Sequence, residues 1–190
     1  MSRWEPNARG RLEQAAMELY GERGYEQTTV TEIAARAGLT ERTFFRHYAD
    51  KREVLFAGSA SLQGLLVDTL TGAPATASPI DAVATALDAA AAVFDERREQ
   101  SRRRQKVISA NAELRERELI KLASLAAALA ESLRARGVAE PAASLAAEAG
   151  IAVFKVAFER WIAGADDRAM GAYIHESLDE LKVVTAGGRA

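Results

Sequence analysis

The sequence predicts an all-α protein of about nine helices, and three observations support this fold class. Alanine, the strongest helix former, accounts for 41 of the 190 residues, whereas proline occurs only 4 times. Apolar residues recur at helical spacing, and the period-two alternation typical of strands is missing. With 48% hydrophobic and 27% charged residues, the chain has the composition of an ordinary folded protein.

Capping residues and glycines delimit the first helices. Thr29 and Glu32 have the spacing of a capping box, and Gly38 ends the helix that this box opens. The chain is predicted to begin with helices at Ala8–Arg23, Val30–Ala37 and Glu41–His47, followed by a longer one from Lys51 to about Leu70.

A stretch rich in Pro, Gly, Ser and Thr, residues Thr71–Pro79, is the clearest loop. Five further helices are expected beyond it: Pro79–Gln100, Ser101–Arg115, Arg117–Arg136, Pro141–Ala163 and Asp167–Thr185. The predicted organisation is therefore an N-terminal part, residues 1–50, and a larger helical part, residues 51–190.

Several function classes lack the residues that they need. The sequence has no cysteine, and its two histidines, His47 and His175, have no Glu three residues before them. We therefore expect no metal site, no cofactor and no catalytic nucleophile–base pair, so that an enzyme is not the expected function. No apolar run reaches the roughly 20 residues of a membrane span, and the charged N-terminus lacks a signal core. A cytoplasmic protein without membrane contacts is expected.

The most informative block is Thr28–Leu55. Two short helices joined by Gly38-Leu39-Thr40 have the dimensions of a helix-turn-helix, whose second helix enters the DNA major groove. One face of the second helix carries groups that can read base edges or hold phosphates: Arg42, Thr43, Arg46 and His47. Between Arg36 and Arg52, five basic residues stand against two acidic ones.

This block resembles the DNA-binding domain of the tetracycline-repressor (TetR) family of transcription regulators. The resemblance rests on residues at fixed spacing: Thr29-Val30, Ile33-Ala34, Ala37-Gly38, Thr40, Thr43, Phe44, Phe45, His47, Tyr48 and Lys51. It covers about residues 8–60. One position departs from the family pattern, because Phe45 stands where a Tyr often donates its hydroxyl to a phosphate.

The resemblance implies that residues 1–50 bind double-stranded operator DNA and that residues 51–190 bind a ligand and form a homodimer. It implies repression rather than activation. The residues expected to contact DNA are Thr28, Thr29, Thr40, Arg42, Thr43, Arg46, His47, Tyr48 and Lys51.

The resemblance also implies that the last two helices pair with those of a second subunit. Small and apolar residues there permit close packing: Ala146, Ala149, Ala152, Val153, Val156, Ala157, Leu178 and Leu181. A small lipophilic effector, for which an acyl-coenzyme A-like molecule is one alternative, is expected in the second part. Its predicted binding residues are Leu62, Leu66, Phe94, Ile108, Asn111 and Phe158.

Some interpretations stay open at this point. The most basic segment, Arg97–Lys106, is either a solvated helix junction, a surface that packs on the acidic residues of the first part, or a site for an anionic effector head group. His175 reads as a surface or dimer-contact residue, and Asp166-Asp167 as a helix cap. An architectural DNA binder without an effector is the rival of a ligand-responsive regulator.

Overall fold

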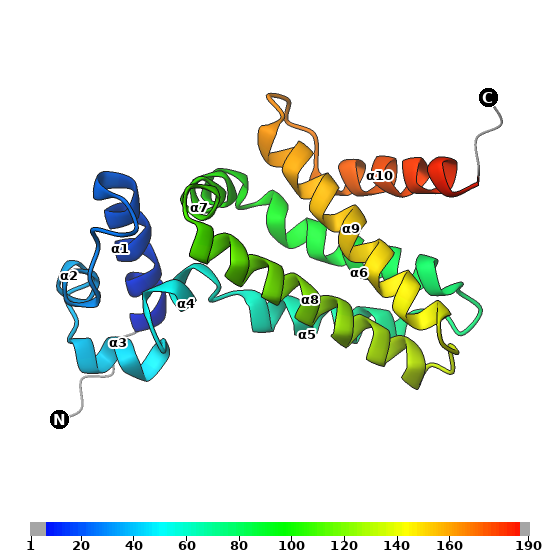
Figure 1. Cartoon of the computed structure of the whole chain (residues 1–190), viewed down its shortest axis with the longest axis horizontal. Helices are drawn as coiled ribbons and strands as arrows, with labels where there is room; N and C mark the ends of the chain where they lie inside the picture. Colours follow the sequence, from blue (N-terminus) through cyan, green and yellow to red (C-terminus); the bar gives the residue numbers. More distant parts are fainter. Residues whose placement is uncertain (1–6, 187–190) are drawn as a thin grey trace. The chain divides into compact units, whose positions relative to one another are not determined.

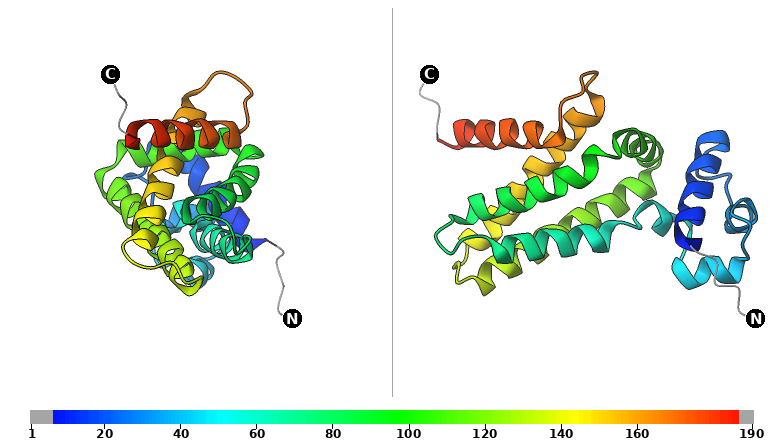
Figure 2. Two further views of the ribbon diagram at one scale, coloured as in Figure 1. Left: turned by 90° about the vertical axis from the view of Figure 1, so that its right-hand side faces the viewer. Right: turned by 180° about the vertical axis from the view of Figure 1, so that it is seen from behind.

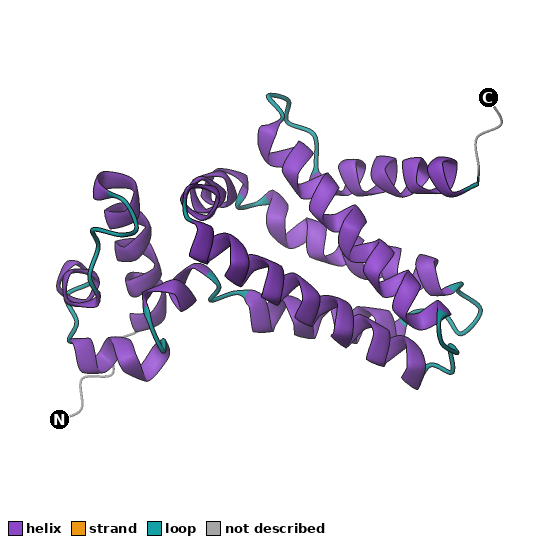
Figure 3. Cartoon of the chain, viewed as in Figure 1, coloured by secondary structure: helices purple, strands orange, loops and turns teal. Residues whose placement is uncertain are grey.

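The computed structural model describes residues 7–186, and every regular element in that range is an α-helix, as predicted (Figures 1 and 3). The helices of this range are α1 (Ala8–Arg23), α2 (Val30–Arg36), α3 (Glu41–His47), α4 (Lys51–Leu55), α5 (Ser59–Gly72), α6 (Pro79–Asp95), α7 (Arg98–Ala110), α8 (Ala112–Ala135), α9 (Ala142–Ala163) and α10 (Met170–Thr185). None of these helices is long and apolar enough to cross a membrane.

The chain forms two compact units. Unit 1 contains Met1–Gly58 and Arg103–Glu118, and unit 2 contains Ser59–Arg102 and Leu119–Ala190. Helices α7 and α8 therefore contribute residues to both units. The predicted division at residue 50 concerns function and stays a prediction, whereas the division of packing assigns the α7–α8 connection to the N-terminal helices.

Unit 1 is built around α1, which packs against α2, α3 and α4. Its buried residues, Leu12, Ala15, Ala16, Leu19 and Tyr20, follow the spacing of a helix with one apolar face. This face covers the buried side chains of Ile33 from α2 and Phe44 from α3. The short helices α2 and α3 depend on this packing, because seven residues are too few for an isolated helix to be stable in water.

The residues from α7 and α8 complete the unit 1 core. Ile108 and Leu114 are fully buried in the same cluster as Leu12 and Phe44. Polar contacts reinforce the junction: the Tyr25 hydroxyl donates to a Glu113 carboxylate oxygen at 3.1 Å, and Arg117 lies 2.6 Å from a Glu53 carboxylate oxygen. The α7–α8 connection is thus an integral part of unit 1.

The predicted helix from Lys51 to about Leu70 is wrong, because α4 ends at Leu55 and α5 begins at Ser59. Phe56, between the two, is buried in the unit 1 core. Its ring also lies 5.0 Å from the Arg104 guanidinium, whose Nε donates to the Leu55 carbonyl at 2.6 Å. Arg104 therefore satisfies a carbonyl at the end of α4 and stabilises the interruption.

Unit 2 is organised around α6, which packs against α5, α9 and α10 (Figure 2). Gly150 allows α9 to approach α6 closely, since a Cβ atom at this position would collide with the side chain of Val83. In the C-terminal half of α9, the rings of Phe154, Phe158 and Trp161 pack with one another and with Phe94 of α6. The centroid distances within this group are 5.6 to 6.5 Å. This aromatic cluster is part of the unit 2 core.

Candidate nucleic-acid interface

The geometry of the helix pair α2–α3 is fixed by backbone constraints. Gly38 has a φ of 66°, a left-handed conformation in which glycine is favoured, and the Leu39 amide donates to the Ala34 carbonyl at 2.8 Å. A Cβ on Gly38 would also lie only 2.7 Å from a guanidinium nitrogen of Arg11. The turn therefore holds α3 at a defined angle to α2.

Thr40 caps the start of helix α3, and its hydroxyl accepts the Thr43 amide at 3.2 Å. Phe44 and Tyr48 anchor its inner side in the unit 1 core. The exposed side chains of the helix and its start are those of Thr40, Glu41, Arg42, Phe45, Arg46 and His47. Helix α3 therefore buries the side that carries Phe44 and exposes the side that carries Arg42, Phe45 and Arg46, as helical periodicity allows.

Two arginines, Arg42 and Arg46, lie on this face of α3. Among the described residues, neither Arg42 nor Arg46 forms a hydrogen bond, ion pair or ring contact. Other arginines of unit 1 behave differently. Arg36 makes a bidentate pair with Glu22 at 2.8 and 2.9 Å, and Arg23 lies 2.5 Å from a Glu32 oxygen. The free guanidinium groups on α3 are thus available to an anionic partner.

Ion pairing changes the pKa values of the groups behind α3. The Arg36 guanidinium lowers the pKa of Glu22 below its ordinary value of 4.5, and the pKa of Arg36 is raised by its bonds to Glu22 and Glu18. The pKa of Glu32 is lowered because the Thr29 backbone amide and hydroxyl donate to it. These carboxylates pair with Arg36 and Arg23, whereas Arg42 and Arg46 on α3 have no acidic partner among the described residues.

The predicted threonines differ in their environment. Thr29 closes the expected capping box, with its amide 2.9 Å from the Glu32 carboxylate. The hydroxyls of Thr40 and Thr43 are 3.1 Å apart and remain on the exposed side of α3. Thr28 is buried, and its hydroxyl donates to the Gly24 carbonyl at 2.8 Å. Thr40 and Thr43 are therefore accessible to a partner, whereas Thr28 closes the connection between α1 and α2.

Two further predicted residues are bonded within the unit. The hydroxyl of Tyr48, a buried residue, donates to a Glu13 carboxylate oxygen at 2.7 Å, and burial raises the pKa of this tyrosine. The ammonium of Lys51 donates to the carbonyls of Tyr25 and Thr28, each at 2.9 Å, and lies 4.3 Å from the centre of the Tyr25 ring. Tyr48 therefore ties the end of α3 to α1, and Lys51 ties the start of α4 to the loop before α2.

The arginines of the basic segment Arg97–Lys106 are largely bonded. Arg98 donates to the carbonyls of Trp161 and Gly164 at 3.0 Å, and the Arg102 Nε donates to Ile162 at 2.7 Å. These carbonyls belong to the last turn of α9 and the residue after it, where helical partners are missing. The two arginines therefore cap α9 within unit 2, whereas Arg104 of the same segment contacts Leu55 and Phe56 in unit 1, as the interpretation of packing on the first part expects.

The predicted ligand-binding residues divide between the units. Leu62, Leu66, Phe94 and Phe158 belong to the unit 2 core cluster, and the rings of Phe94 and Phe158 are 5.6 Å apart. Ile108 is buried in unit 1, and the Asn111 amide donates to the Val107 carbonyl at 2.7 Å. The structure therefore places four of the six in the core of unit 2 and the other two in unit 1.

With the geometry of both units known, comparison with protein families identifies the chain. Residues 13–57 match the model described as "Bacterial regulatory proteins, tetR family", and residues 77–186, more than half of the chain, match the "MftR C-terminal domain". The chain belongs to the TetR family. It is a TetR-family transcriptional regulator, and its helix-turn-helix is the DNA-binding element of that family.

Relatives of this TetR-family regulator include the HTH-type transcriptional regulator TcmR of Streptomyces glaucescens. The two are 37% identical over 81 residues, which are 43% of this chain but only 36% of TcmR. The matched region thus spans little more than a third of that relative.

Solved structures show the same fold at low identity. A transcriptional regulator of Pseudomonas aeruginosa PAO1 has a TM-score of 0.68 at 18% identity, with 98% of this chain and 94% of the other covered. The repressor FadR of Thermus thermophilus, in complex with lauroyl-CoA, has a TM-score of 0.57 at 23% identity, with 96% and 95% covered. The SmeT–triclosan complex gives 0.64 at 19% identity, with 93% and 90% covered.

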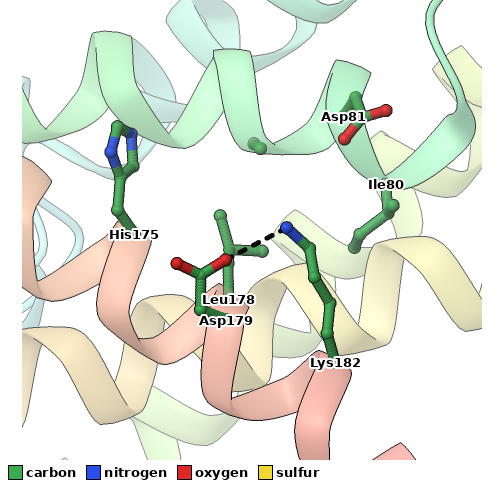
Figure 4. A pocket seen from close by; sticks show the side chains of 7 residues that line it. Ile80, Asp81, His175, Leu178, Asp179 and Lys182 are labelled. Carbon is green, nitrogen blue, oxygen red and sulfur yellow. Dashed lines mark hydrogen bonds and ion pairs between the residues drawn. The ribbon is translucent and has the colours of Figure 1, made fainter. Parts of the chain in front are cut away.

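In this regulator, a shallow groove of about 240 Å³ lies between α6 and α10 (Figure 4). Ile80 and Leu178 form its apolar wall, and Asp179 and Lys182, both on α10, pair at 3.1 Å along its edge. His175 also lines it, with Nε2 2.8 Å from an Asp88 carboxylate oxygen. Among the described residues, no group of His, Asp and Glu is arranged to hold a metal ion.

Sequence reasoning assigned no role to one exposed residue of α3. Arg42 lies three positions before Phe45, a spacing that places two side chains on the same side of a helix, and Arg46 follows Phe45 directly. This spacing was the signal that could have placed Phe45 on the same face as Arg42 and Arg46.

Proposed function

We propose that this TetR-family regulator is a repressor that binds a near-palindromic operator as a homodimer and is released by a small lipophilic effector. The observation that carries DNA binding is the pair of unbonded guanidinium groups, Arg42 and Arg46, on the exposed face of α3. An arginine fork matches the acceptors of guanine in the major groove and also pairs with phosphates. Residues 1–50 would read the DNA, and residues 51–190 would sense the ligand and dimerise.

Within the predicted DNA contacts, we assign two kinds of role. Arg42, Thr43, Arg46 and His47, together with Thr40, would touch DNA. Thr28, Thr29, Tyr48 and Lys51 would instead hold the helix-turn-helix in position, since their polar groups are bonded to carbonyls, to Glu32 or to Glu13.

Selection of bound sequences from random double-stranded DNA, followed by a salt titration, tests this part. The expected result is a motif with two half-sites about one helical turn apart, since each subunit supplies one recognition helix. Recovery of only unrelated, salt-labile sequences would contradict specific operator binding.

Dimerisation through α9 and α10 is supported by the exposed residues of α9. Leu145, Ala149, Ala152 and Val156 follow one another at four- and three-residue intervals and form one stripe, on which Leu145 is 65% and Val156 49% exposed. Val153, Ala157 and Leu178, which were expected at this interface, are buried in the core of unit 2.

The double substitution Leu145→Glu and Val156→Glu tests the stripe. It should convert a dimer to a monomer in light scattering at micromolar concentration and abolish operator binding, because two recognition helices are needed for specific affinity. Leu119→Glu on α8 is the matched control, since this leucine is 58% exposed and lies outside the stripe. A wild-type monomer would contradict the proposal.

Effector binding is proposed for the aromatic and aliphatic core of unit 2. The lauroyl-CoA complex of FadR and the triclosan complex of SmeT support a lipophilic ligand, because both proteins share the fold. The aliphatic residues Leu62 and Leu66 and the cluster of Phe94 and Phe158 suit an apolar chain. Arg98 and Arg102 are bonded to carbonyls, so an anionic head group would have to displace these contacts.

Operator affinity with and without lauroyl-CoA or triclosan, in wild type and in Phe158→Ala, tests this part. A coupling of about 1–3 kcal/mol would weaken operator binding roughly 5- to 150-fold in wild type and less in the variant. Val93→Ala, at an exposed neighbour of Phe94, is the control. A ligand that binds tightly without changing operator affinity would favour an architectural DNA binder.

A further inference from the structure

Helix α3 exposes the aromatic ring of Phe45 at the surface of the protein. Phe45 is 54% exposed, and it is the exposed large hydrophobic side chain of unit 1 within residues 7–186. Every other phenylalanine of this unit in that range is buried in the core: Phe44 and Phe56. Exposure of so much aromatic surface to water is unfavourable, so an occupant that covers the ring gains free energy.

The charges around the ring indicate what covers it. Arg42 precedes Phe45 by three positions on α3 and Arg46 follows it directly, and neither arginine has a partner among the described residues. A protein surface that docked here would have to bury two unpaired guanidinium groups with the ring, which is costly. A polyanion with apolar groups between its charges satisfies all three side chains at once.

The orientation of the ring is restrained from inside. The rings of Phe44 and Phe45 pack edge to face, with centroids 5.4 Å apart and planes 82° apart. Because Phe44 is fully buried, it acts as a fixed support against which Phe45 is held. A braced side chain loses little rotamer freedom on binding, and this favours a specific contact.

The apolar group that DNA presents to a side chain in the major groove is the C5-methyl of thymine. We propose that Phe45 reads a thymine methyl group in each operator half-site, an assignment that rests on the operator binding proposed above. The aromatic hydroxyl that would hold a phosphate is missing at this position, and the bare ring edge suits a methyl group instead. Phe45 is then a specificity-determining residue of the interface, between two arginines that contribute guanine or phosphate contacts.

The decisive experiment changes a single methyl group. An operator is first selected from random DNA with the wild-type chain, and each thymine is then replaced by deoxyuridine, which lacks only that methyl. For wild type, one thymine position per half-site should lose about fourfold in affinity, and both half-sites together about 16-fold, if burial of one methyl is worth about 0.8 kcal/mol. In Phe45→Ala the deoxyuridine penalty should disappear, and in Phe45→Leu part of it should remain.

Arg42→Ala is the matched control, because it should lower overall affinity and keep the deoxyuridine penalty. Phe45→Ala should fold normally, since its side chain is largely outside the core, and its circular dichroism and melting temperature check this. An operator that tolerates every deoxyuridine within twofold in wild type would overturn the assignment, as would a full penalty in Phe45→Ala. Failure to select any operator would overturn operator recognition itself, and the thymine contact with it.

Discussion

Helices α3 and α7 both carry arginines, but they use them in opposite ways. On α3, Arg42 and Arg46 have no intramolecular partner among the described residues. On α7, Arg98 and Arg102 donate to carbonyls at the end of α9, and Arg104 donates to the Leu55 carbonyl and lies 3.4 Å from a Glu118 oxygen. By charge content alone, α7 would be the stronger candidate for an anionic ligand.

The difference shows that the bonding state of a guanidinium, more than the density of positive charge, distinguishes a binding surface from a structural one. An arginine that already satisfies several carbonyls must break those hydrogen bonds before it can hold a ligand. An unbonded arginine loses only its hydration and side-chain freedom.

Substitution of the α3 arginines should have the largest effect on function. Arg42→Ala and Arg46→Ala are each expected to lower operator affinity by about 5- to 150-fold for each half-site, since a good arginine–base pair is worth about 1–3 kcal/mol. The melting temperature should stay at the wild-type value, because neither side chain has an internal partner. Equilibrium binding and thermal unfolding check the two halves of this expectation. A fall in melting temperature with unchanged affinity would remove the contrast between α3 and α7.

Substitution on α7 should do the reverse. Arg98→Ala is expected to lower the free energy of unfolding by about 2–4 kcal/mol, because several carbonyls at the end of α9 lose their donor. Urea unfolding measures the loss, and operator affinity of the folded fraction should be unchanged. Arg97→Ala, at the exposed neighbouring arginine, should have little effect. Equal stability of the two variants would mean that Arg98 does not cap α9.

Substitution of Lys51 tests whether its ammonium binds DNA phosphates or only stabilises the fold. Lys51→Met keeps the apolar stem and removes the ammonium, and the loss of its carbonyl contacts should lower the free energy of unfolding by about 1–2 kcal/mol. The slope of operator affinity against salt should be unchanged if Lys51 touches no phosphate. Lys106→Met, at an exposed lysine of α7, is the control for loss of one charge. A shallower salt slope with unchanged stability would place Lys51 on a phosphate, as its position in the family motif implies.

The smallest effect concerns the carboxylates that neutralise arginines outside α3. The pKa of Glu22 is lowered from 4.5 by Arg36, so its stabilising contribution is present above pH 4.5 and is lost as the pH falls through the lowered value. Glu22→Gln should therefore reduce the melting temperature by a few degrees at pH 7. This difference from wild type should shrink as the pH falls below 4.5. Glu26→Gln, at an exposed side chain of the same unit, should show little difference at either pH.

Local signals made the DNA-binding half of the fold predictable. The bounds of α1 and α3 are those expected from the sequence, and the Thr29 capping box and the Gly38 turn form as expected. Each of these features is signalled by residues close to one another in the sequence, although α3 also needs its packing against α1 to be stable. The interruption between α4 and α5 could not be predicted in this way, because it depends on Phe56 packing in the core and on Arg104 from α7.

The candidate site was predictable only in its position on α3. Helical periodicity brings Arg42 and Arg46 to one face, but it does not reveal that they are unbonded. The partners of Arg98, Lys51 and Tyr48 lie 23 to 66 residues away in the chain. Such long-range hydrogen bonds decide which polar groups remain for DNA, and a single sequence carries no local trace of them.

The sharing of α7 and α8 between the units limits how modular this regulator can be. A fragment ending at Gly58 would lack Ile108 and Leu114, so part of the apolar cluster around α1 would face water. If two regulators exchanged their N-terminal helices at that point, each set of helices would pack against the α7–α8 connection of the other protein. Chimeras should therefore fold only when Arg103–Glu118 is exchanged together with the N-terminal helices that it packs against.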